Sequence, residues 1–364
     1  MSFQLIFQSK KSQARLGRLK TGHGSLLTPF FMPIATRGVV KGISSTELEN
    51  LKTKIILANT YHLMVKPGRE FLKSIRGLHR FMNWSGPILT DSGGYQVFSL
   101  ARHNTITNQG VKFKDPKSGT RRFLTPEESI RTQKAIGSDI MIAFDQCTPY
   151  SPKKSQVEKA VKHTISWAKR CLAQHKKNKN SQLLFAVGQG DRFLDLRLSC
   201  VEELRKMDFD GYCYGGMAPL KTVYTMLEKV LPAYPQNKPR YLMGVGYPDN
   251  IVQAVQRGVD MFDCVIPTRE GRHGRVFLRD KKKKLGRPGF FQAINLQRAE
   301  FLFDKTPLDK NCACPACRNY TRSYLSYLLK IGDYLSPRLL SLHNIKFYLD
   351  LMKEIRKNIR AGEL

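Results

Sequence analysis

Short apolar segments alternate with helical patterns along this chain, and that alternation limits the fold more than any other feature. We expect strands at residues 29–36, 54–61, 87–95, 139–147, 183–190, 211–217, 240–246 and 260–268. Apolar residues recur at helical spacing within 126–137, 155–177, 193–207, 222–231 and 249–258. Repeated strand–helix units predict an α/β fold, a (β/α)8 TIM barrel, with a doubly wound open sheet as the main alternative.

Polar or glycine-rich residues follow the apolar part of nearly every predicted strand. They occupy 59–62, 91–94, 189–190, 215–216 and 244–246, together with Asp145 and Asp263. Any one of them could be a simple turn signal. As a set they favour the barrel, because the catalytic groups of such barrels gather at the carboxyl-terminal ends of the strands.

The charge of the chain indicates a polyanionic partner. Sixty-one Lys and Arg residues against 29 Asp and Glu residues give a formal net charge of +32 over 364 residues. A field of that sign favours nucleic acid or an anionic membrane surface, and a merely soluble basic surface is the alternative. The length suits a single barrel.

Segments that would direct the chain to a membrane or out of the cell are not expected. No apolar run reaches the roughly 18 residues of a transmembrane helix, and the first 20 residues lack a secretory pattern. Five cysteines without regular spacing indicate reduced thiols: Cys147, Cys171, Cys200, Cys213 and Cys264. We therefore expect a cytoplasmic protein that meets RNA or DNA.

A cysteine cluster near the C-terminus predicts a metal site. Cys312, Cys314 and Cys317, with the more distant His343, form the ligand set of a closed tetrahedral zinc site. Three cysteines within six residues are too close to occupy three separate core positions, although a chance cluster of thiols is the alternative. Four protein ligands leave no open position, so one structural Zn²⁺ is expected.

These patterns suggest three parts. Residues 1–275 should form the barrel, with a hairpin from two alternating stretches in the first 28 residues. Residues 276–343 should form an inserted basic zinc-binding subdomain. Residues 344–364 should complete the barrel with a C-terminal helix, part of a helical pattern that spans 339–360.

Two carboxylates stand at apolar strand ends, where burial is costly. Asp91 lies in TDSGGYQVFS and Asp263 in FDCVIPTR. A buried carboxylate needs partners or stays protonated, and structural capping is the other interpretation of each. Two carboxylates at one barrel mouth suggest displacement at a sugar carbon. One would attack as nucleophile while the other serves as acid and then as base.

Long motifs in a fixed order resemble those of the bacterial-type tRNA-guanine transglycosylases, from about residue 15 to about residue 355. They are TPFFMPIATRGVVKG, ILANTYHLMVKPG, LHRFMNWSGPILTDSGGYQVFSL, SDIMIAFDQCTPY, RYLMGVG, FDCVIPTREGRHG and the cysteine cluster. The resemblance implies a (β/α)8 barrel with an inserted zinc subdomain. It also implies an enzyme that exchanges guanine at the tRNA wobble position for a free 7-deazaguanine base, queuine or 7-aminomethyl-7-deazaguanine. A homodimer is expected on the same basis.

The resemblance gives each matching position a role. Asp263 matches the nucleophile that bonds to ribose C1′, and Asp91 matches the general acid and base. The residues expected to contact the base are Asp145, Gln189 and the backbone of Gly216, with Tyr95 and Met243 on the two faces of its ring. The matching zinc ligands are Cys312, Cys314, Cys317 and His343.

Basic residues after the eighth predicted strand are candidates for RNA contact. Arg269 and Arg272 match family residues that contact the anticodon loop. We expect these two, Arg275 and the lysine run 281–284 to bind phosphate. For the lysine run, a solvated loop is an equal alternative.

Three stretches near the expected base pocket depart from the family pattern. Gln146 stands where the family usually has glutamate, and residues 186–191 read AVGQGD in place of GIVQGG. Pro219 and Lys221 replace valine and glutamate in the loop after Gly216. Because these changes remove acidic character where the 7-substituent should lie, we expect a preference for queuine over 7-aminomethyl-7-deazaguanine.

Two other functions compete with this interpretation. A non-catalytic tRNA-binding subunit of the same family would not need both Asp91 and Asp263. A zinc-dependent hydrolase of nucleosides would need an open metal position, which a Cys3His set does not provide.

Overall fold

Eight parallel strands form the centre of the molecule in the computed structural model, which describes residues 2–100, 104–115, 118–177 and 180–364. The strands are β4 (Phe30–Pro33), β5 (Ile56–Ala58), β6 (Ile88–Thr90), β10 (Ile140–Ile142), β11 (Leu183–Gly188), β12 (Gly211–Tyr214), β13 (Arg240–Leu242) and β14 (Met261–Cys264). Their order is β4-β14-β13-β12-β11-β10-β6-β5. A parallel bridge between Ile34 and Leu57 joins the two outer strands, so the sheet closes. The predicted barrel is confirmed, and the open-sheet alternative is wrong.

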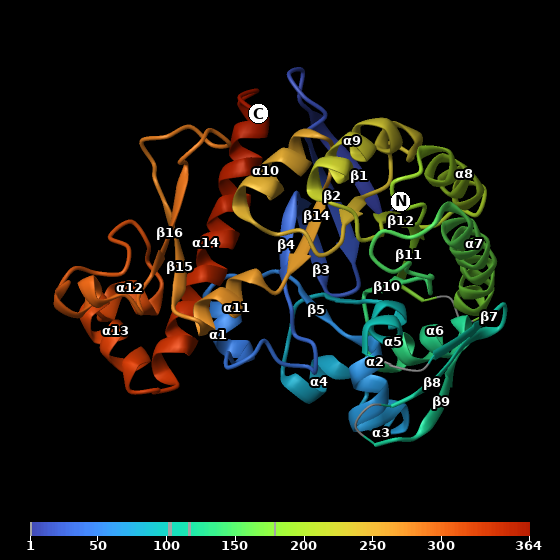
Figure 1. Ribbon diagram of the computed structural model, residues 1–364, viewed down its shortest axis with the longest axis horizontal. Helices are drawn as coiled ribbons and strands as arrows, with labels where there is room; N and C mark the ends of the chain where they lie inside the picture. The colour runs from blue at the N-terminus through green and yellow to red at the C-terminus, as the bar shows by residue number, and fades with distance from the viewer. Residues whose placement is uncertain (1, 101–103, 116–117, 178–179) are drawn as a thin grey trace.

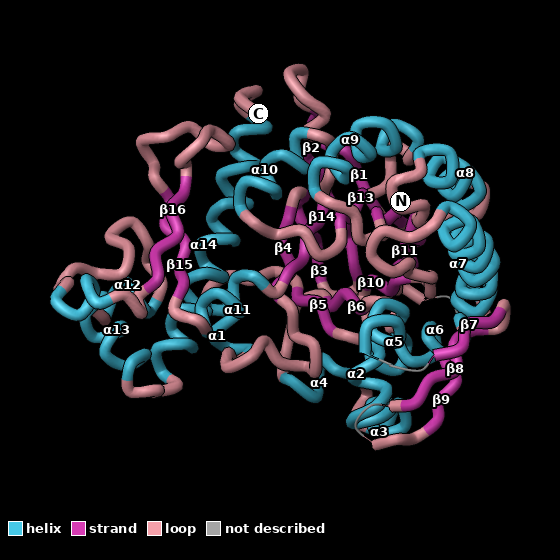
Figure 2. The backbone as a smooth tube through the Cα atoms, viewed as in Figure 1, coloured by secondary structure: helices cyan, strands magenta, loops and turns pink. Residues whose placement is uncertain are grey.

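Helices surround the barrel (Figures 1 and 2). Those between the strands are α1 (Ser45–Asn50), α2 (Thr60–Leu63), the π-helical turn η1 (Met64–Gly68), α3 (Arg69–Ser74), α4 (Leu78–Met82), α5 (Gly94–Leu100), α6 (Pro126–Ile136), α7 (Lys154–Lys176), α8 (Leu194–Arg205), α9 (Leu220–Val230), the 3₁₀ turn η2 (Leu231–Ala233) and α10 (Pro248–Gln256). After β14 come α11 (Ile266–Arg272) and the long α14 (Leu335–Arg360). The helical patterns of the sequence correspond to α6–α10 and α14.

The last helix is longer than its pattern predicts. It begins at Leu335 rather than at residue 339, with Tyr334 as its N-cap. Pro337 suggests a later start, but proline is tolerated in a first turn, where its missing N–H is not needed. The boundary that we expect between residues 343 and 344 therefore falls inside one continuous helix.

A three-stranded antiparallel sheet covers the amino-terminal end of the barrel. It consists of β1 (Phe3–Gln8), β2 (Arg15–Thr21) and β3 (Gly24–Thr28). The structure therefore has one strand more than the two-stranded hairpin that we expect from the sequence. Leu19 and Leu26 belong to the same buried cluster as the inward side chains of the barrel strands. Arg15 donates to Asp260, just before β14, from Nε at 3.0 and 3.2 Å, and both side chains are buried. Apolar contact and a compensated ion pair thus close this end.

A second antiparallel sheet, which the sequence reasoning missed, follows α5. Its strands are β7 (Asn104–Thr107), β8 (Gly110–Lys114) and β9 (Arg121–Leu124). Gly110 has φ +152°, and an added Cβ there would lie 2.3 Å from the Leu124 carbonyl oxygen. The turn Asn108–Gln109 before this glycine was the available hairpin signal.

The cysteine cluster lies in a separate group of elements beside α14, drawn in orange in Figure 1. The group contains β15 (Arg275–Arg279), β16 (Phe291–Asn295), the 3₁₀ turn η3 (Ala299–Phe303), α12 (Pro315–Asn319) and α13 (Arg322–Lys330). Its buried side chains share one cluster with residues of α14 and of the barrel wall, including Leu48 and Leu72. The group therefore packs on the barrel through a continuous apolar contact.

Candidate active site and metal centre

Asp91 follows β6 and is held by residues that follow the neighbouring strand β5. The Asn59 amide donates to Oδ2, and the backbone N–H groups of Thr60 and Gly93 donate to Oδ1 at 3.0 and 3.2 Å. Burial raises the pKa of Asp91 to about 7, with further contributions from the charges of Asp263 and Asp145. The carboxyl group can therefore gain or lose a proton near neutral pH.

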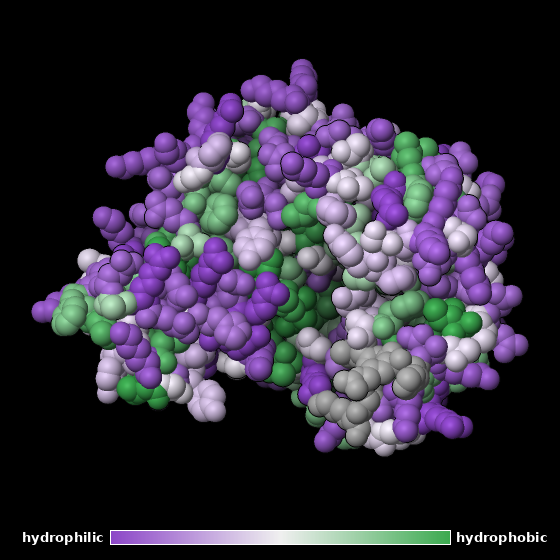
Figure 3. Space-filling view, in the orientation of Figure 1, coloured by the Kyte–Doolittle hydropathy of each residue, from purple (hydrophilic) through white to green (hydrophobic). Residues whose placement is uncertain are grey.

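Asp263 lies within β14 and is 7% exposed. The hydroxyl of Tyr241 donates to Oδ1 at 2.5 Å, and the N–H of Gly244 donates to the same oxygen at 2.9 Å. Burial raises the pKa of Asp263, and these two donors act against the rise. Asp91 directly follows β6 and Asp263 lies near the end of β14, so both stand at the carboxyl-terminal rim of one barrel, and the charge of Asp263 also raises the pKa of Asp91. Figure 3 shows a hollow with hydrophobic walls on this side, between α11 and α5.

Asp145 and Gln189 form a hydrogen-bonded pair beside these carboxylates. Gln189 Nε2 donates to Asp145 Oδ2 at 2.7 Å, and Ser92 Oγ donates to Oδ1 at 3.0 Å. Burial raises the pKa of Asp145. Gln189 Oε1 is buried and has no hydrogen-bond partner within the part of the chain that the structure describes. A buried amide oxygen of this kind is a natural acceptor for a ligand N–H group.

Two glycines allow the loop after β12 to approach this pair. A Cβ on Gly215 would lie 2.7 Å from Gln189 Nε2, and one on Gly216 would lie 2.8 Å from Arg197 Nη2. Gly216 has φ +120°, a conformation that side chains rarely adopt. Substitution at either position would therefore push the loop away from Gln189.

Arg197, which the sequence reasoning missed, connects the segment that contains Gln189 with the loop after β12 through hydrogen bonds. It is 1% exposed and donates to the carbonyl oxygens of Asp191, Gly188 and Gly215 at 2.5, 3.2 and 2.8 Å. Its guanidinium lies 3.8 Å from the centre of the Tyr214 ring. One buried cation thus fixes the backbone on both sides of Gln189.

The two residues expected on the faces of a base come from opposite sides of the hollow. Tyr95 is at the start of α5 and 47% exposed. Met243 follows β13 and packs partly buried against the barrel interior. Both follow strand ends that carry a carboxylate or one of its donors.

The expected phosphate contacts divide into two groups. Arg269 and Arg272 lie on α11, directly after the strand of Asp263, and Arg275 begins β15. Glu270 is within 3.4 Å of Arg269 and 3.6 Å of Arg275. The lysine run 281–284 lies elsewhere, in the exposed connection after β15, where nearby Gly286 approaches Val252 of α10.

One departure from the family pattern does not lie where we expect it. The Gln146 side chain turns to α7, where its Oε1 lies 2.5 Å from Nδ1 of His163. His163 Nε2 lies 2.7 Å from Asn108 Oδ1 in the β7–β8 turn. Since successive side chains of an extended segment point to opposite sides, Asp145 faces the hollow and Gln146 faces away from it. Its loss of charge is therefore not at the base pocket.

The four residues of the cysteine cluster do come together. The ligand atoms of Cys312, Cys314, Cys317 and His343 all lie within 4.8 Å of one another. His343 Nδ1 lies 3.7 Å from the sulfur of Cys314 and 3.2 Å from that of Cys317. His343 Nε2 lies 2.8 Å from the Phe277 carbonyl oxygen, an acceptor that places the proton on Nε2 and leaves Nδ1 free to bind a metal. The donor set fits Zn²⁺.

A second cluster of possible ligands does not fit a metal in this arrangement. His23, His79 and Asp139 meet at the amino-terminal end of the barrel. The two rings stack with centroids 3.7 Å apart and an angle of 16° between planes. A metal lies in the plane of each imidazole that binds it, and stacked, nearly parallel rings cannot share such a point. His23 Nδ1 instead lies within hydrogen-bond distance of Asp139 Oδ1, at 2.9 Å.

Several residues that support the site carry weak sequence signals. Asn59 and Ser92 stand next to predicted strand ends. The sequence shows that they are polar, but it does not show that they bind Asp91 and Asp145. Tyr241 lies inside a predicted strand and reads as core. Arg197 is the clearest signal, because a basic residue on the inner side of a helix requires buried acceptors.

A closed parallel barrel with three acidic side chains at the carboxyl-terminal ends of its strands is typical of an enzyme of the (β/α)8 class, and a separate Cys3His cluster could hold a metal ion. The sequence profile described as Queuine tRNA-ribosyltransferase matches residues 9–364. Proteins named Queuine tRNA-ribosyltransferase from Acetivibrio thermocellus and Symbiobacterium thermophilum are each 45% identical, over 100% and 99% of this chain and 94% and 88% of their own lengths. One from Staphylococcus aureus is 44% identical over 100% of this chain and 94% of its own. This chain belongs to the queuine tRNA-ribosyltransferase family, and it is a pentosyltransferase.

Across the described residues, the helices that reach 18 residues are too polar to cross a lipid bilayer.

Metal removal tests the cysteine cluster. We expect about one zinc ion per purified chain, and Cys317→Ser should lose most of it and lower the Tm, because binding free energy at a structural site contributes to folding. Metal analysis and thermal unfolding measure both effects. Cys200→Ser, a buried thiol on α8, is the matched control and should keep its zinc. Full zinc content in the Cys317 variant would contradict the assignment.

The raised pKa of Asp91 predicts a pH-dependent stability. Between 3.8 and about 7 the native state holds this proton more tightly than the unfolded chain, so the contribution of Asp91 to the free energy of unfolding should fall as pH rises through that window. The slope is about 1.4 kcal/mol per pH unit. Asp91→Asn has no carboxyl group to titrate at this position. Its free energy of unfolding relative to that of the wild type should therefore increase with pH and level off above pH 7.

Urea unfolding at stepped pH measures that difference. Asp350→Asn removes a carboxylate from the surface of α14 and serves as the control; it should follow the wild-type curve. A gap between wild type and Asp91→Asn that stays constant with pH would show that Asp91 has an ordinary pKa.

Proposed function

We propose that this enzyme exchanges guanine at the wobble position of tRNA for a free 7-deazaguanine base through a covalent ribosyl-Asp263 intermediate. The observation that carries the proposal is the shared, buried environment of Asp263 and Asp91, in a chain of the queuine tRNA-ribosyltransferase family. An accessory RNA-binding subunit gains nothing from withdrawing two carboxylates from water at one end of the barrel, which costs free energy.

The first half of the reaction removes guanine. Asp263, aligned by Tyr241 and Gly244, attacks ribose C1′ while the glycosidic C–N bond breaks. The bond's electron pair leaves with N9 of guanine, and positive charge develops on the sugar, which the Asp263 carboxylate stabilises. Asp91 in its neutral form donates a proton to the departing base.

The second half reverses these steps with a different base. Asp91, now ionised, removes the N9 proton of the incoming deazaguanine, and N9 attacks C1′. The bond between C1′ and Asp263 breaks and its electron pair returns to the carboxylate. A pKa of about 7 suits Asp91 to both halves, because neither protonation state is rare at neutral pH.

Base recognition follows from the groups around Asp145. Its carboxylate can accept two N–H bonds from the edge of a guanine-like base, while the Gly216 N–H and the second hydrogen of Gln189 Nε2 can donate to the base carbonyl. Tyr95 offers an aromatic face and Met243 a polarizable thioether for the ring. Since a stacked base is out of reach, the wobble nucleotide must be turned out of the anticodon loop.

The remaining groups bind RNA and support the fold. Arg269, Arg272 and Arg275 neutralise phosphates of the anticodon loop. The metal is Zn²⁺, which stabilises the elements around β15 and β16 and supplies no chemistry at C1′. We place the enzyme in the cytoplasm, where tRNA is available.

We also propose a homodimer. Apolar and aromatic side chains are exposed around α13 and η3, among them Phe303 at 87%, Tyr334 at 90% and Ile331 at 56%. A group of this kind on one side of a soluble protein is typical of a protein–protein contact.

Trapping the intermediate tests the mechanism. Incubated with an anticodon hairpin that carries guanine at the wobble position, the wild-type protein should form a complex that survives denaturing electrophoresis. Asp263→Asn should form none yet still bind the hairpin, because the amide is not a nucleophile. Free 7-deazaguanine base should release the wild-type adduct. A protein that only binds RNA would form no adduct even as wild type.

Competition between bases tests the substrate preference, which we propose to be queuine. With Gln146 directed away, two differences remain near Gly216: the loop that carries Pro219 and Lys221, and the stretch 186–191, whose Asp191 Cα would lie 3.9 Å from a Cβ on Gly216. Lys221 should disfavour a cationic aminomethyl group, so Lys221→Glu should raise kcat/KM for 7-aminomethyl-7-deazaguanine relative to queuine by about tenfold, or about 1.4 kcal/mol. Displacement of labelled guanine from tRNA measures the ratio. A wild-type enzyme that favours the aminomethyl base would overturn the preference.

A further inference from the structure

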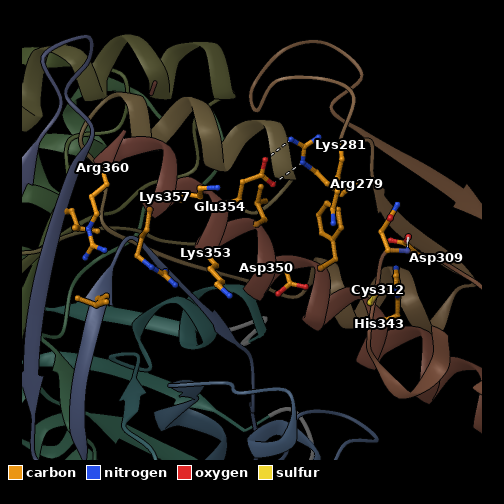
Figure 4. Close-up of a pocket in the computed structure, with 16 residues that line it drawn as sticks. Arg279, Lys281, Asp309, Cys312, His343, Asp350, Lys353, Glu354, Lys357 and Arg360 are labelled. Atoms are coloured by element: carbon orange, nitrogen blue, oxygen red, sulfur yellow. Dashed lines mark hydrogen bonds and ion pairs between the residues drawn. The ribbon is translucent and has the colours of Figure 1, made fainter. Parts of the chain in front are cut away.

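A groove with a volume of about 790 Å³ runs along α14, on the side of the barrel wall rather than at the mouth. Leu16 and Leu27 of the amino-terminal sheet and Phe347 and Leu351 of α14 form apolar parts of its lining. Figure 4 shows Lys353, Lys357 and Arg360 along α14, with Arg279 and Lys281 at the other end, towards the metal centre. The proposed reaction uses none of these residues.

The positive charges of the groove are not compensated. Lys353, Lys357 and Arg360 are exposed and follow one another at the i, i+4 and i+7 positions of a single helix face. Among the described residues, no ion pair includes these three, Arg356 or Lys281. Five cations of the described chain therefore line one concave surface without a carboxylate partner, and one of them, Arg356, donates to the Pro29 carbonyl oxygen at 2.6 Å.

Three carboxylates line the groove: two are already paired with cations, and the third, Asp309, accepts the N–H of Asn311 at 2.8 Å. Glu354 accepts from Nε and Nη2 of Arg279 at 3.0 and 2.6 Å, and Asp350 is paired with Lys346. Glu354 and Asp350 cannot neutralise the other cations without giving up these partners, so Asp309 is the one carboxylate of the lining left to face five positive charges. Burial, and to a smaller extent the charge of Arg360, lowers the pKa of Arg356 to about 10.

One strand connects the groove to the barrel mouth. β15 begins at Arg275, next to α11, and ends at Arg279 in the groove. Residues 275, 277 and 279 point to the same side of a strand, and the two arginines are about 13 Å apart along it. Phe277, between them, is buried beneath α14. β15 thus carries one arginine near the mouth and one in the groove, with a buried residue between them.

We propose that this groove binds the sugar–phosphate backbone of tRNA outside the anticodon loop. The inference rests on the proposed function for the identity of the RNA. Unpaired cations spaced along a helix suit a chain of phosphates, and binding would release counterions without reading sequence. A flat bilayer cannot follow a concave surface of this kind, and the connection through β15 to Arg275 favours RNA over an acidic peptide.

The test compares two RNAs on one variant. Lys353→Gln, Lys357→Gln and Arg360→Gln are combined, since all three side chains are exposed and the fold should tolerate the change. The control combines Lys159→Gln, Lys162→Gln and Lys169→Gln on the exposed side of α7. Fluorescence anisotropy gives the Kd of full-length tRNA and of the isolated anticodon hairpin at several salt concentrations.

The groove variant should bind full-length tRNA roughly tenfold more weakly at about 0.1 M salt, with a salt slope smaller by about 2. Its affinity for the hairpin and its base exchange on the hairpin should equal those of the wild type, and the α7 control should change neither RNA. Equal loss for both RNAs, no loss for either, or an equal effect in the control overturns the proposal. So does tight binding of polyglutamate that disappears in the groove variant while tRNA binding persists. Wild-type protein without exchange on the hairpin would refute the proposed reaction, and the two affinities would still test the groove.

Discussion

The burial of Asp91 beside Asp263 and Asp145 is the interaction on which the rest of the structure depends. Placing three carboxylates in one poorly solvated site raises the pKa of each, which is a cost in stability at neutral pH. Donors from adjacent strand ends offset part of that cost, as the amides of Thr60 and Gly244 show. Only a closed ring of parallel strands brings those ends together around one hollow.

The two ends of the barrel treat charge in opposite ways. At the amino-terminal end, Arg15 and Asp260 are buried as a matched pair under the small sheet. At the mouth, the three acidic groups form no ion pair within the described part of the chain, and the buried Arg197 holds backbone carbonyl groups instead. The first arrangement stabilises the fold, and the second leaves acid and base groups available for chemistry.

The fold was largely predictable because its strands are continuous apolar runs that end in polar residues. The candidate site was predictable for the same reason, since Asp91, Asp145 and Asp263 all stand at such ends. The sheet β7–β9 was missed because its strands are half-exposed and mostly polar, so periodicity is weak there. The direction of Gln146 was missed because its neighbour's role was extended to it, although adjacent side chains point to opposite sides.

By itself, the sequence determined the alternation of strands and helices, the excess of positive charge and the spacing of the metal ligands, because each is a local or compositional property. Tertiary structure alone decided which groups meet. Asn59 reaches Asp91 across 32 residues, Tyr241 reaches Asp263 across 22, and Arg279 reaches Glu354 across 75. Such contacts depend on closure of the barrel and on the path of α14, and side-chain pKa values and the groove beside that helix follow from them.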